Sequence, residues 1–333
     1  MATSSGPTAI STARARRSSV TCSAPPSALL AAWPAFAWPR MSHRSTRRRS
    51  MSLTRRDSLR MLGSGVAAAA LWPRERLLVY AARKGVKFKV GVTDWNLKLE
   101  GKPEAVELAK RIGFDGVQIS IGKGTDRLPL SDPALQQTYL AESKRVGLPL
   151  ASLCLEVLHR NYLKSDPLGQ RWVADAIPIA RAMGVKVILL PFFGKGALET
   201  PAEMDHVGDA LREVAPAAEK VGVILGLEDT ISARDNVRIM ERTKSPAVLT
   251  YYDVGNSTKG GFDVVEEIRW LGAGRICEVH LKDNPNYLGQ GKIDFPAQWA
   301  ELETDCPSGS VEKDMATNLA YIRGVMAKRS AAA

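Results

Sequence analysis

The sequence predicts an α/β fold in which helices cover a parallel sheet. Short, β-branched apolar runs recur along residues 83–333, and segments with helical spacing of apolar residues separate them. Runs that are apolar at every position are typical of strands buried on both faces, as in parallel sheets. Residues 83–333 number 251, and a (β/α)8 TIM barrel needs about 250. A barrel is therefore the predicted fold.

Seven runs are expected to form strands: residues 88–92, 117–121, 149–155, 185–191, 223–227, 248–252 and 276–281. Between them, helical spacing is clearest at 105–112 and 173–180. Glycines follow four of the helical segments, where a left-handed C-cap is common: Gly113, Gly147, Gly184 and Gly222. A doubly wound open sheet is the competing architecture, but no GxGxxG motif follows the first strand to support it.

The eighth strand has little chain available to it. After the loop at 282–294, the nine residues 295–303 must supply a helix, a turn and a strand. A two-turn helix with a five-residue strand needs roughly fifteen residues. Strand eight is therefore predicted to be truncated or irregular. Either the protein itself lacks this piece, or the sequence carries an internal loss.

The basic charge of the chain belongs to its first segment. Residues 1–90 hold 17 of the 46 lysines and arginines, with Asp57 and Glu75 as their acids. The remaining 29 basic and 33 acidic residues give the rest of the chain a net charge of −4. The body is therefore mildly acidic, which argues against a nucleic-acid-binding surface.

Residues 1–82 are predicted to be a disordered basic leader, and residues 83–333 the barrel. Within the leader, residues 51–82 contain Arg55 and Arg56 before a short apolar stretch, which resembles a twin-arginine export signal. That stretch is too short to anchor the chain stably in a membrane. Export, with a periplasmic location, is the expectation. A disordered tail on a cytoplasmic protein is the alternative.

Three of the apolar runs lead into a polar side chain that suits metal binding. Glu228, Asp253 and His280 lie at the ends of predicted strands five, six and seven, and Glu303 is a fourth candidate. Active sites of such barrels form at the carboxyl ends of the strands, so these side chains should share one rim. The set suits one divalent ion, Mn, Mg or Co, and Zn is compatible. Alternatively, each is a solvated or ion-paired residue at a strand end.

The segments GLEDT, YYDVGN and HLKDN, the last followed by YLGQGKIDF, resemble the xylose isomerase-like superfamily of TIM barrels. The similarity is to its sugar phosphate isomerase/epimerase family, which includes ketose 3-epimerases, inosose dehydratase and hydroxypyruvate isomerase. The resemblance implies that Glu228, Asp253, His280 and Glu303 hold a single divalent ion. It also implies that Glu228 and Glu303, on opposite faces of the sugar, form the catalytic acid/base pair.

Chemistry supports this division of roles. A carbon-bound proton next to a ketone is too weakly acidic for a carboxylate alone, so a cation must polarise the carbonyl and stabilise an enediolate. One glutamate then removes the proton and the other returns it, which isomerises or epimerises the sugar. The expected protein is a metal-dependent sugar isomerase/epimerase. Two alternatives are a degenerate barrel that binds a sugar or cyclitol without turnover and an inosose dehydratase-like lyase, and the short segment before Glu303 leaves activity open.

Two further residues are candidates for substrate contact. Trp95 follows strand one and offers an apolar wall to a sugar, or else packs on the rim; Asn256 offers a polar contact, or else shapes a turn. His159 is expected to be a solvated loop histidine, and Lys282 to form a loop ion pair. The expected partner is a small sugar or cyclitol, and the oligomeric state stays open between monomer and homo-oligomer.

A nuclease of the endonuclease IV type belongs to the same superfamily and has to be weighed. That enzyme is known by a trinuclear zinc site rich in histidines. This chain holds four histidines, one of them in the leader, and has Asn256 where a ligand histidine would be expected. With its acidic body, the chain is not expected to bind nucleic acid.

Overall fold

The computed structural model describes residues 89–291, 300–302 and 306–332. The predicted leader, with Arg55 and Arg56, lies outside the described residues, and so does Glu303. In the described part, no helix has the length and apolar character that crossing a membrane requires.

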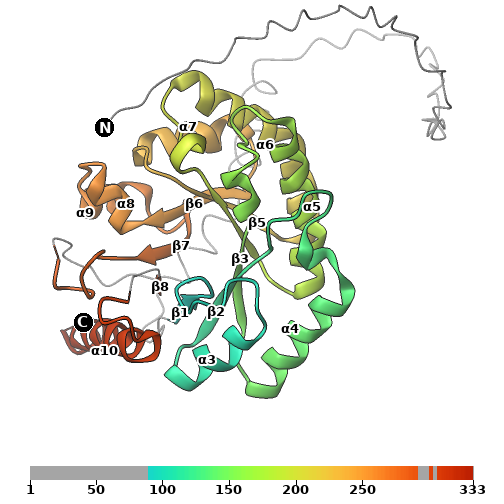
Figure 1. Cartoon of the computed structure of the whole chain (residues 1–333). Coiled ribbons are helices and arrows are strands. Elements are labelled where there is room, and N and C mark those ends of the chain that lie inside the picture. Colours follow the sequence, from blue (N-terminus) through green and yellow to red (C-terminus); the bar gives the residue numbers. More distant parts are fainter. Residues whose placement is uncertain (1–88, 292–299, 303–305, 333) are drawn as a thin grey trace, which may run out of the picture. The chain divides into compact units, whose positions relative to one another are not determined.

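Eight parallel strands form a closed barrel in sequence order (Figure 1). The strands are β1 (Val90–Thr93), β2 (Gly116–Ser120), β3 (Leu150–Cys154), β4 (Val187–Pro191), β5 (Ile224–Glu228), β6 (Val248–Asp253), β7 (Ile276–Leu281) and β8 (Ala300–Leu302). Each strand pairs with its neighbours in sequence, and β8 pairs with β1. The predicted (β/α)8 barrel is confirmed, and the open sheet is excluded by the β1–β8 pairing.

The barrel is closed by a strand of three residues. β8 pairs with β7 at His280↔Glu301 and Leu281↔Leu302, and Ala300, Glu301 and Leu302 pair with β1. The expected truncation of strand eight is confirmed. Between β7 and β8 no helix is described, although residues 292–299 lie outside the described part.

Helices surround the barrel (Figure 1). They are α3 (Glu104–Ile112), α4 (Pro133–Val146), α5 (Pro167–Met183), α6 (Pro201–Val221), α7 (Ala233–Thr243), α8 (Val254–Lys259), α9 (Val264–Leu271) and α10 (Val311–Ala332), with the short 3-10 turns η1 (Pro129–Ser131), η2 (Glu156–His159) and η3 (Gly194–Gly196). The four predicted glycine C-caps follow α3, α4, α5 and α6, each with a positive φ between 66° and 107°.

The core has two parts with different roles. The larger cluster contains most of the buried apolar residues of the strands and helices, with Trp172 and Tyr139 among its largest side chains. A small second cluster contains Cys154, Leu189 and Tyr251, and Trp95 packs against it. Cys154 and Leu189 also line the pocket described below, so this second cluster gives the pocket its apolar floor.

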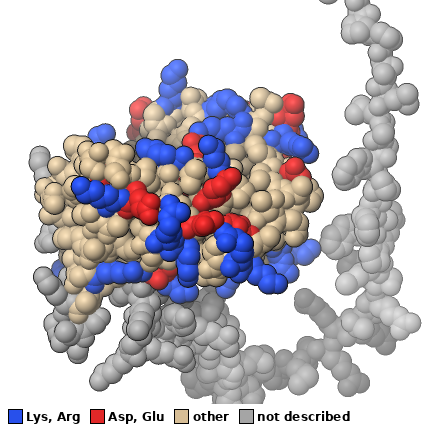
Figure 2. Space-filling model, turned by 60° about the horizontal axis from the view of Figure 1, so that its bottom comes forward, with Lys and Arg blue, Asp and Glu red and all other residues tan. Residues whose placement is uncertain are grey.

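Charged side chains of both signs are mixed on the surface. Figure 2 shows lysines and arginines interleaved with aspartates and glutamates over one face. On the helices, Arg145 contacts Glu107 at 2.7 Å and Arg111 contacts Glu312 at 3.1 Å. Exposed pairs of this kind contribute about 0 to 1 kcal/mol each.

Candidate functional site

Three neighbouring strands bring Glu228, Asp253 and His280 together. Glu228 is the last residue of β5, Asp253 is the last residue of β6, and His280 is the second-to-last residue of β7. Asp253 and His280 are direct register partners. All three residues are buried, with 0 to 3 % of their surface exposed, and their ligand atoms lie within 4.8 Å of one another. The predicted convergence on one rim is therefore what the fold produces.

Hydrogen bonds fix the orientation of the His280 ring. Its Nδ1 lies 3.0 Å from Glu228 Oε1, and its Nε2 lies 2.9 Å from Gln118 Oε1. The amide nitrogen of Gln118 donates to Tyr251 Oη at 3.2 Å, so the amide oxygen faces His280 and accepts the proton of the tautomer that is protonated at Nε2. The Nδ1 lone pair then points toward Glu228 and Asp253, as a metal ion between these groups requires.

Asp253 uses its two oxygens for different purposes. Oδ1 accepts a hydrogen bond from the backbone N–H of Asn256 at 2.8 Å and so caps the N-terminus of α8. Oδ2 lies 2.7 Å from Lys282 Nζ and 3.9 Å from His280 Nδ1. The cap fixes the orientation of the carboxylate, and the second oxygen faces the side chains of Lys282 and His280.

The donor set fits a divalent metal ion. Two carboxylates and one imidazole, buried together, match the ligands that Mn, Co and Zn take, and the carboxylates also suit Mg. Burial strengthens the attraction between carboxylates and a cation because little water screens it. Glu228, Asp253 and His280 would hold such an ion. The fourth predicted ligand, Glu303, lies outside the described residues.

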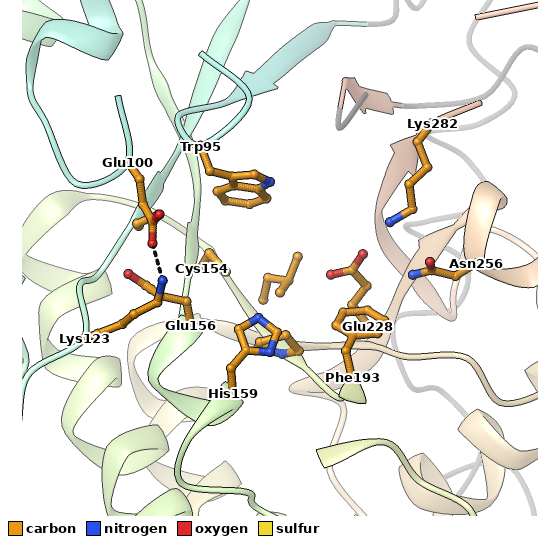
Figure 3. Close-up of a pocket in the computed structure, with 13 residues that line it drawn as sticks. Trp95, Glu100, Lys123, Cys154, Glu156, His159, Phe193, Glu228, Asn256 and Lys282 are labelled. Carbon is orange, nitrogen blue, oxygen red and sulfur yellow. Dashed lines mark hydrogen bonds and ion pairs between the residues drawn. The ribbon is translucent and has the colours of Figure 1, made fainter. Parts of the chain in front are cut away.

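A pocket borders Glu228, one residue of the triad (Figure 3). Its volume is about 310 Å³, which lies within the range of small-molecule sites. Trp95 lies on one side of the cavity and Phe193 with His159 on another, while Glu228, Asn256 and Lys282 form a polar wall. The space suits a monosaccharide whose apolar ring face packs on aromatic side chains.

The two predicted substrate contacts, Trp95 and Asn256, both line this pocket. Trp95 also contacts His280 edge-on, with ring centroids 6.1 Å apart. Their role toward a substrate stays a prediction. His159 was expected to be a solvated loop residue; it is exposed and also lines the pocket, beside Phe193.

Sequence reasoning missed Gln118 and Glu156. Gln118 lies inside an apolar run and is fully buried, so its hydrophobic neighbours conceal its contact with His280. Glu156 begins η2, two residues after β3 ends, and its position after a strand is the same signal that revealed the triad. Burial raises the pKa of Glu156 to about 7, although the backbone N–H of Gly122 donates to its Oε1 at 2.7 Å.

Asp94 supports the loop that carries Trp95 and Glu100. Its Oδ2 accepts hydrogen bonds from the backbone N–H groups of Gly101 and Ser120, each at 2.9 Å. Its Oδ1 accepts from Ser120 Oγ at 2.8 Å. Burial raises the pKa of Asp94 to about 6, against these hydrogen bonds, which favour the ionised form. This network ties the loop after β1 to the end of β2 beside the pocket.

Comparison with known proteins identifies the family. Residues 106–308 match the xylose isomerase-like TIM barrel family, so the chain belongs to it. The chain is 28% identical over 206 residues to 2-epi-5-epi-valiolone 7-phosphate 2-epimerase of Actinoplanes sp., which covers 62% of this chain and 76% of that protein. It is 29% identical over 213 residues to the L-ribulose-5-phosphate 3-epimerase UlaE of Escherichia coli. The aligned region covers 58% of this chain and 74% of that protein. The chain therefore stands among isomerases and epimerases.

Solved structures show the same fold. The 3-keto-D-glucoside 4-epimerase YcjR of E. coli is 19% identical with a TM-score of 0.59, over 72% of this chain and 100% of that one. A D-psicose 3-epimerase of Clostridium cellulolyticum is 16% identical with a TM-score of 0.60, over 71% of this chain and 99% of that one. At these identities the comparison supports the barrel alone.

Proposed function

We propose that this protein is a metal-dependent sugar epimerase or isomerase that moves a proton on the carbon next to a carbonyl group. The observation that carries the proposal is the buried Glu228, Asp253 and His280 triad, of which Glu228 lines a sugar-sized pocket. The relatives named as sugar epimerases support the same reaction class.

Several residues of the site have a part in the proposed reaction. A bound divalent ion would supply positive charge that polarises the carbonyl and stabilises the enediolate. Glu228 lines the pocket and removes the carbon-bound proton as the general base. Trp95 packs against the sugar and excludes water, and Asn256 donates to or accepts from a hydroxyl group. Lys282, 2.7 Å from Asp253, adds a further positive charge beside the carbonyl oxygen.

A second acid is needed to return the proton. The resemblance gives this role to Glu303, which follows directly after Leu302 of the short strand β8. Return of the proton on the opposite face inverts the carbon centre, and transfer to the neighbouring carbon isomerises the sugar. The identity of the sugar and of the metal is part of the same proposal.

The test combines metal analysis with solvent exchange. The purified chain is analysed for bound metal, then incubated in deuterated water with ketoses and inososes while deuterium incorporation next to the carbonyl is followed by NMR. We expect about one divalent ion per chain and deuterium at that carbon. A chain that binds no metal after reconstitution would remove the proposed mechanism.

The short β8 strand favours a second candidate, a barrel that binds a sugar or cyclitol without turnover. The described part of β8 has three residues, and the proton-returning role depends on the residue that follows them in the sequence. Bound metal and sugar without deuterium incorporation in the same experiment would favour this candidate.

A further inference from the structure

A second polar wall faces the pocket from the segments that follow β1, β2 and β3, away from the triad. Figure 3 shows Glu100, Lys123 and Glu156 together on one side of the cavity, with Glu228, Lys282 and Asn256 on the other. Lys123 Nζ lies 2.6 Å from Glu100 Oε1. The proposed mechanism uses none of these three residues.

Glu156 is the unusual member of this wall. It lines the pocket with 5 % of its surface exposed. Its Oε1 accepts from Gly122, whereas its Oε2 has no hydrogen-bond partner among the described residues. A buried polar atom without a partner costs about 1 to 3 kcal/mol. A hydroxyl group of a bound sugar would supply the missing hydrogen bond.

The charges of this wall disfavour an anion. Lys123 is already paired with Glu100, and Glu156 adds a second carboxyl group beside that pair. Among the described residues that line the pocket there is no arginine, and the other lysine, Lys282, pairs with Asp253. A phosphate dianion placed here would meet two acidic groups and one occupied lysine, and the burial of Glu156 would strengthen its repulsion of an anion.

We propose that the wall of Glu100, Lys123 and Glu156 is a subsite for free hydroxyl groups of the substrate, and that Glu156 forms a hydrogen bond with one of them. The end of the substrate remote from the reacting carbon then carries no phosphate, unlike the substrates named for the two relatives above. This inference rests on the proposed function, because it places the reacting end of the sugar at the triad.

The experiment compares L-ribulose with L-ribulose 5-phosphate on the full chain loaded with Mn²⁺. Dissociation constants come from calorimetry and turnover from deuterium incorporation, for the wild type and two variants. We expect the wild type to bind the free ketose about 10-fold more tightly than its phosphate. Glu156→Met should weaken binding of the free ketose about 10-fold. The double variant Glu100→Gln with Glu156→Gln should shift the preference about 10-fold toward the phosphate.

Glu241→Gln, an exposed change of the same chemistry on α7, serves as the control and should leave both constants unchanged. Circular dichroism confirms that each variant is folded. Tighter binding of the phosphate by the wild type, an unchanged preference in the double variant, or no binding of either sugar overturns the subsite. Binding that follows the expected pattern without deuterium incorporation retains the subsite and removes the proposed reaction. Deuterium incorporation together with a preference for the phosphate retains the proposed reaction and removes the subsite.

Discussion

Glu228 has two proposed functions that depend on the same carboxylate. One oxygen lies 3.0 Å from His280 Nδ1, inside the proposed metal site, and the side chain also borders the pocket. A carboxylate beside a cation stays ionised, and an ionised carboxylate is the form that accepts a proton. The position of Glu228 therefore supports both metal binding and general-base catalysis.

Replacement of Glu228 by glutamine should abolish turnover. The amide keeps the shape and one ligand oxygen but cannot take a proton from carbon, so we expect the rate to fall by at least about 100-fold. Deuterium incorporation into the substrate measures this rate, and metal content is measured on the same sample. Substantial exchange by a metal-loaded variant would remove Glu228 from the base role.

Gln118 should control metal affinity without contacting the metal. Gln118→Leu removes the acceptor for the His280 Nε2 proton, and affinity should fall roughly 10- to 100-fold. Gln118→Glu keeps an acceptor oxygen and should retain most of the affinity. Competition with a chromogenic chelator measures both constants. Equal affinity in the leucine variant and the wild type would show that Gln118 does not position the ring.

Glu156 should make stability fall as pH rises. Burial raises its pKa to about 7, so the folded state keeps a proton that the unfolded state loses near pH 4.5. Its contribution is therefore most favourable below pH 4.5, and it falls by about 3 kcal/mol as pH rises through 7. Glu156→Gln is neutral throughout and avoids this loss.

The measurement for Glu156 is the free energy of unfolding by denaturant, at pH 5 and pH 8, for the wild type and Glu156→Gln. The difference between the two proteins should change by about 2.5 kcal/mol in favour of the variant between pH 5 and pH 8. Parallel pH dependence of the two proteins would contradict a raised pKa at this position.

At the scale of elements, a helix cap fixes the end of one strand of the site. Asp253 ends β6 and caps α8 with the same side chain, so the strand-to-helix turn and the proposed ligand position are one feature. Other caps involve residues outside the triad. At the start of α6, Thr200 and Glu203 form a reciprocal capping box, far along the chain from the triad.

Thr200→Ala tests this purely structural role. The change removes the hydroxyl that accepts from the N–H of Glu203 at 3.3 Å, and we expect a loss of about 1 kcal/mol in the free energy of unfolding. Thr200→Ser keeps the hydroxyl and should stay within a few tenths of the wild type. Denaturant midpoints measure both, and exchange activity should be unchanged.

At the scale of the whole molecule, the site exists because the barrel closes. Glu228, Asp253 and His280 approach one another only when β5, β6 and β7 pair in register. A metal that binds the folded state alone must therefore stabilise the whole barrel.

Addition of Mn²⁺ at about 100 times its dissociation constant should stabilise the fold by about 2.7 kcal/mol. For a barrel of this size we expect the midpoint of thermal unfolding to rise by roughly 5 to 10 °C, and EDTA should reverse the shift. Asp253→Asn keeps an oxygen to cap α8 but loses the charge, so its shift should be much smaller. An equal shift in this variant would place the stabilising metal elsewhere.

Local chemistry made the strands, the glycine caps and the triad predictable. Residues 276–281 were predicted as a strand with the bounds that β7 has, because apolar and β-branched residues dominate this short segment. Gln118 was not predictable, because its role depends on a histidine 162 positions away along the chain. The leader and Glu303 lie outside the described residues, and export and the fourth ligand stay predictions.

The sequence by itself determined the barrel, the shortness of β8 and the rim that carries Glu228, Asp253 and His280. Periodicity and position after a strand are local properties, and a parallel barrel turns them into a shared site. Only the tertiary structure decided which groups meet. It joined Gln118 to His280, Lys282 to Asp253, and Glu156 to the pocket, because contacts between distant segments depend on register and packing that no local pattern encodes.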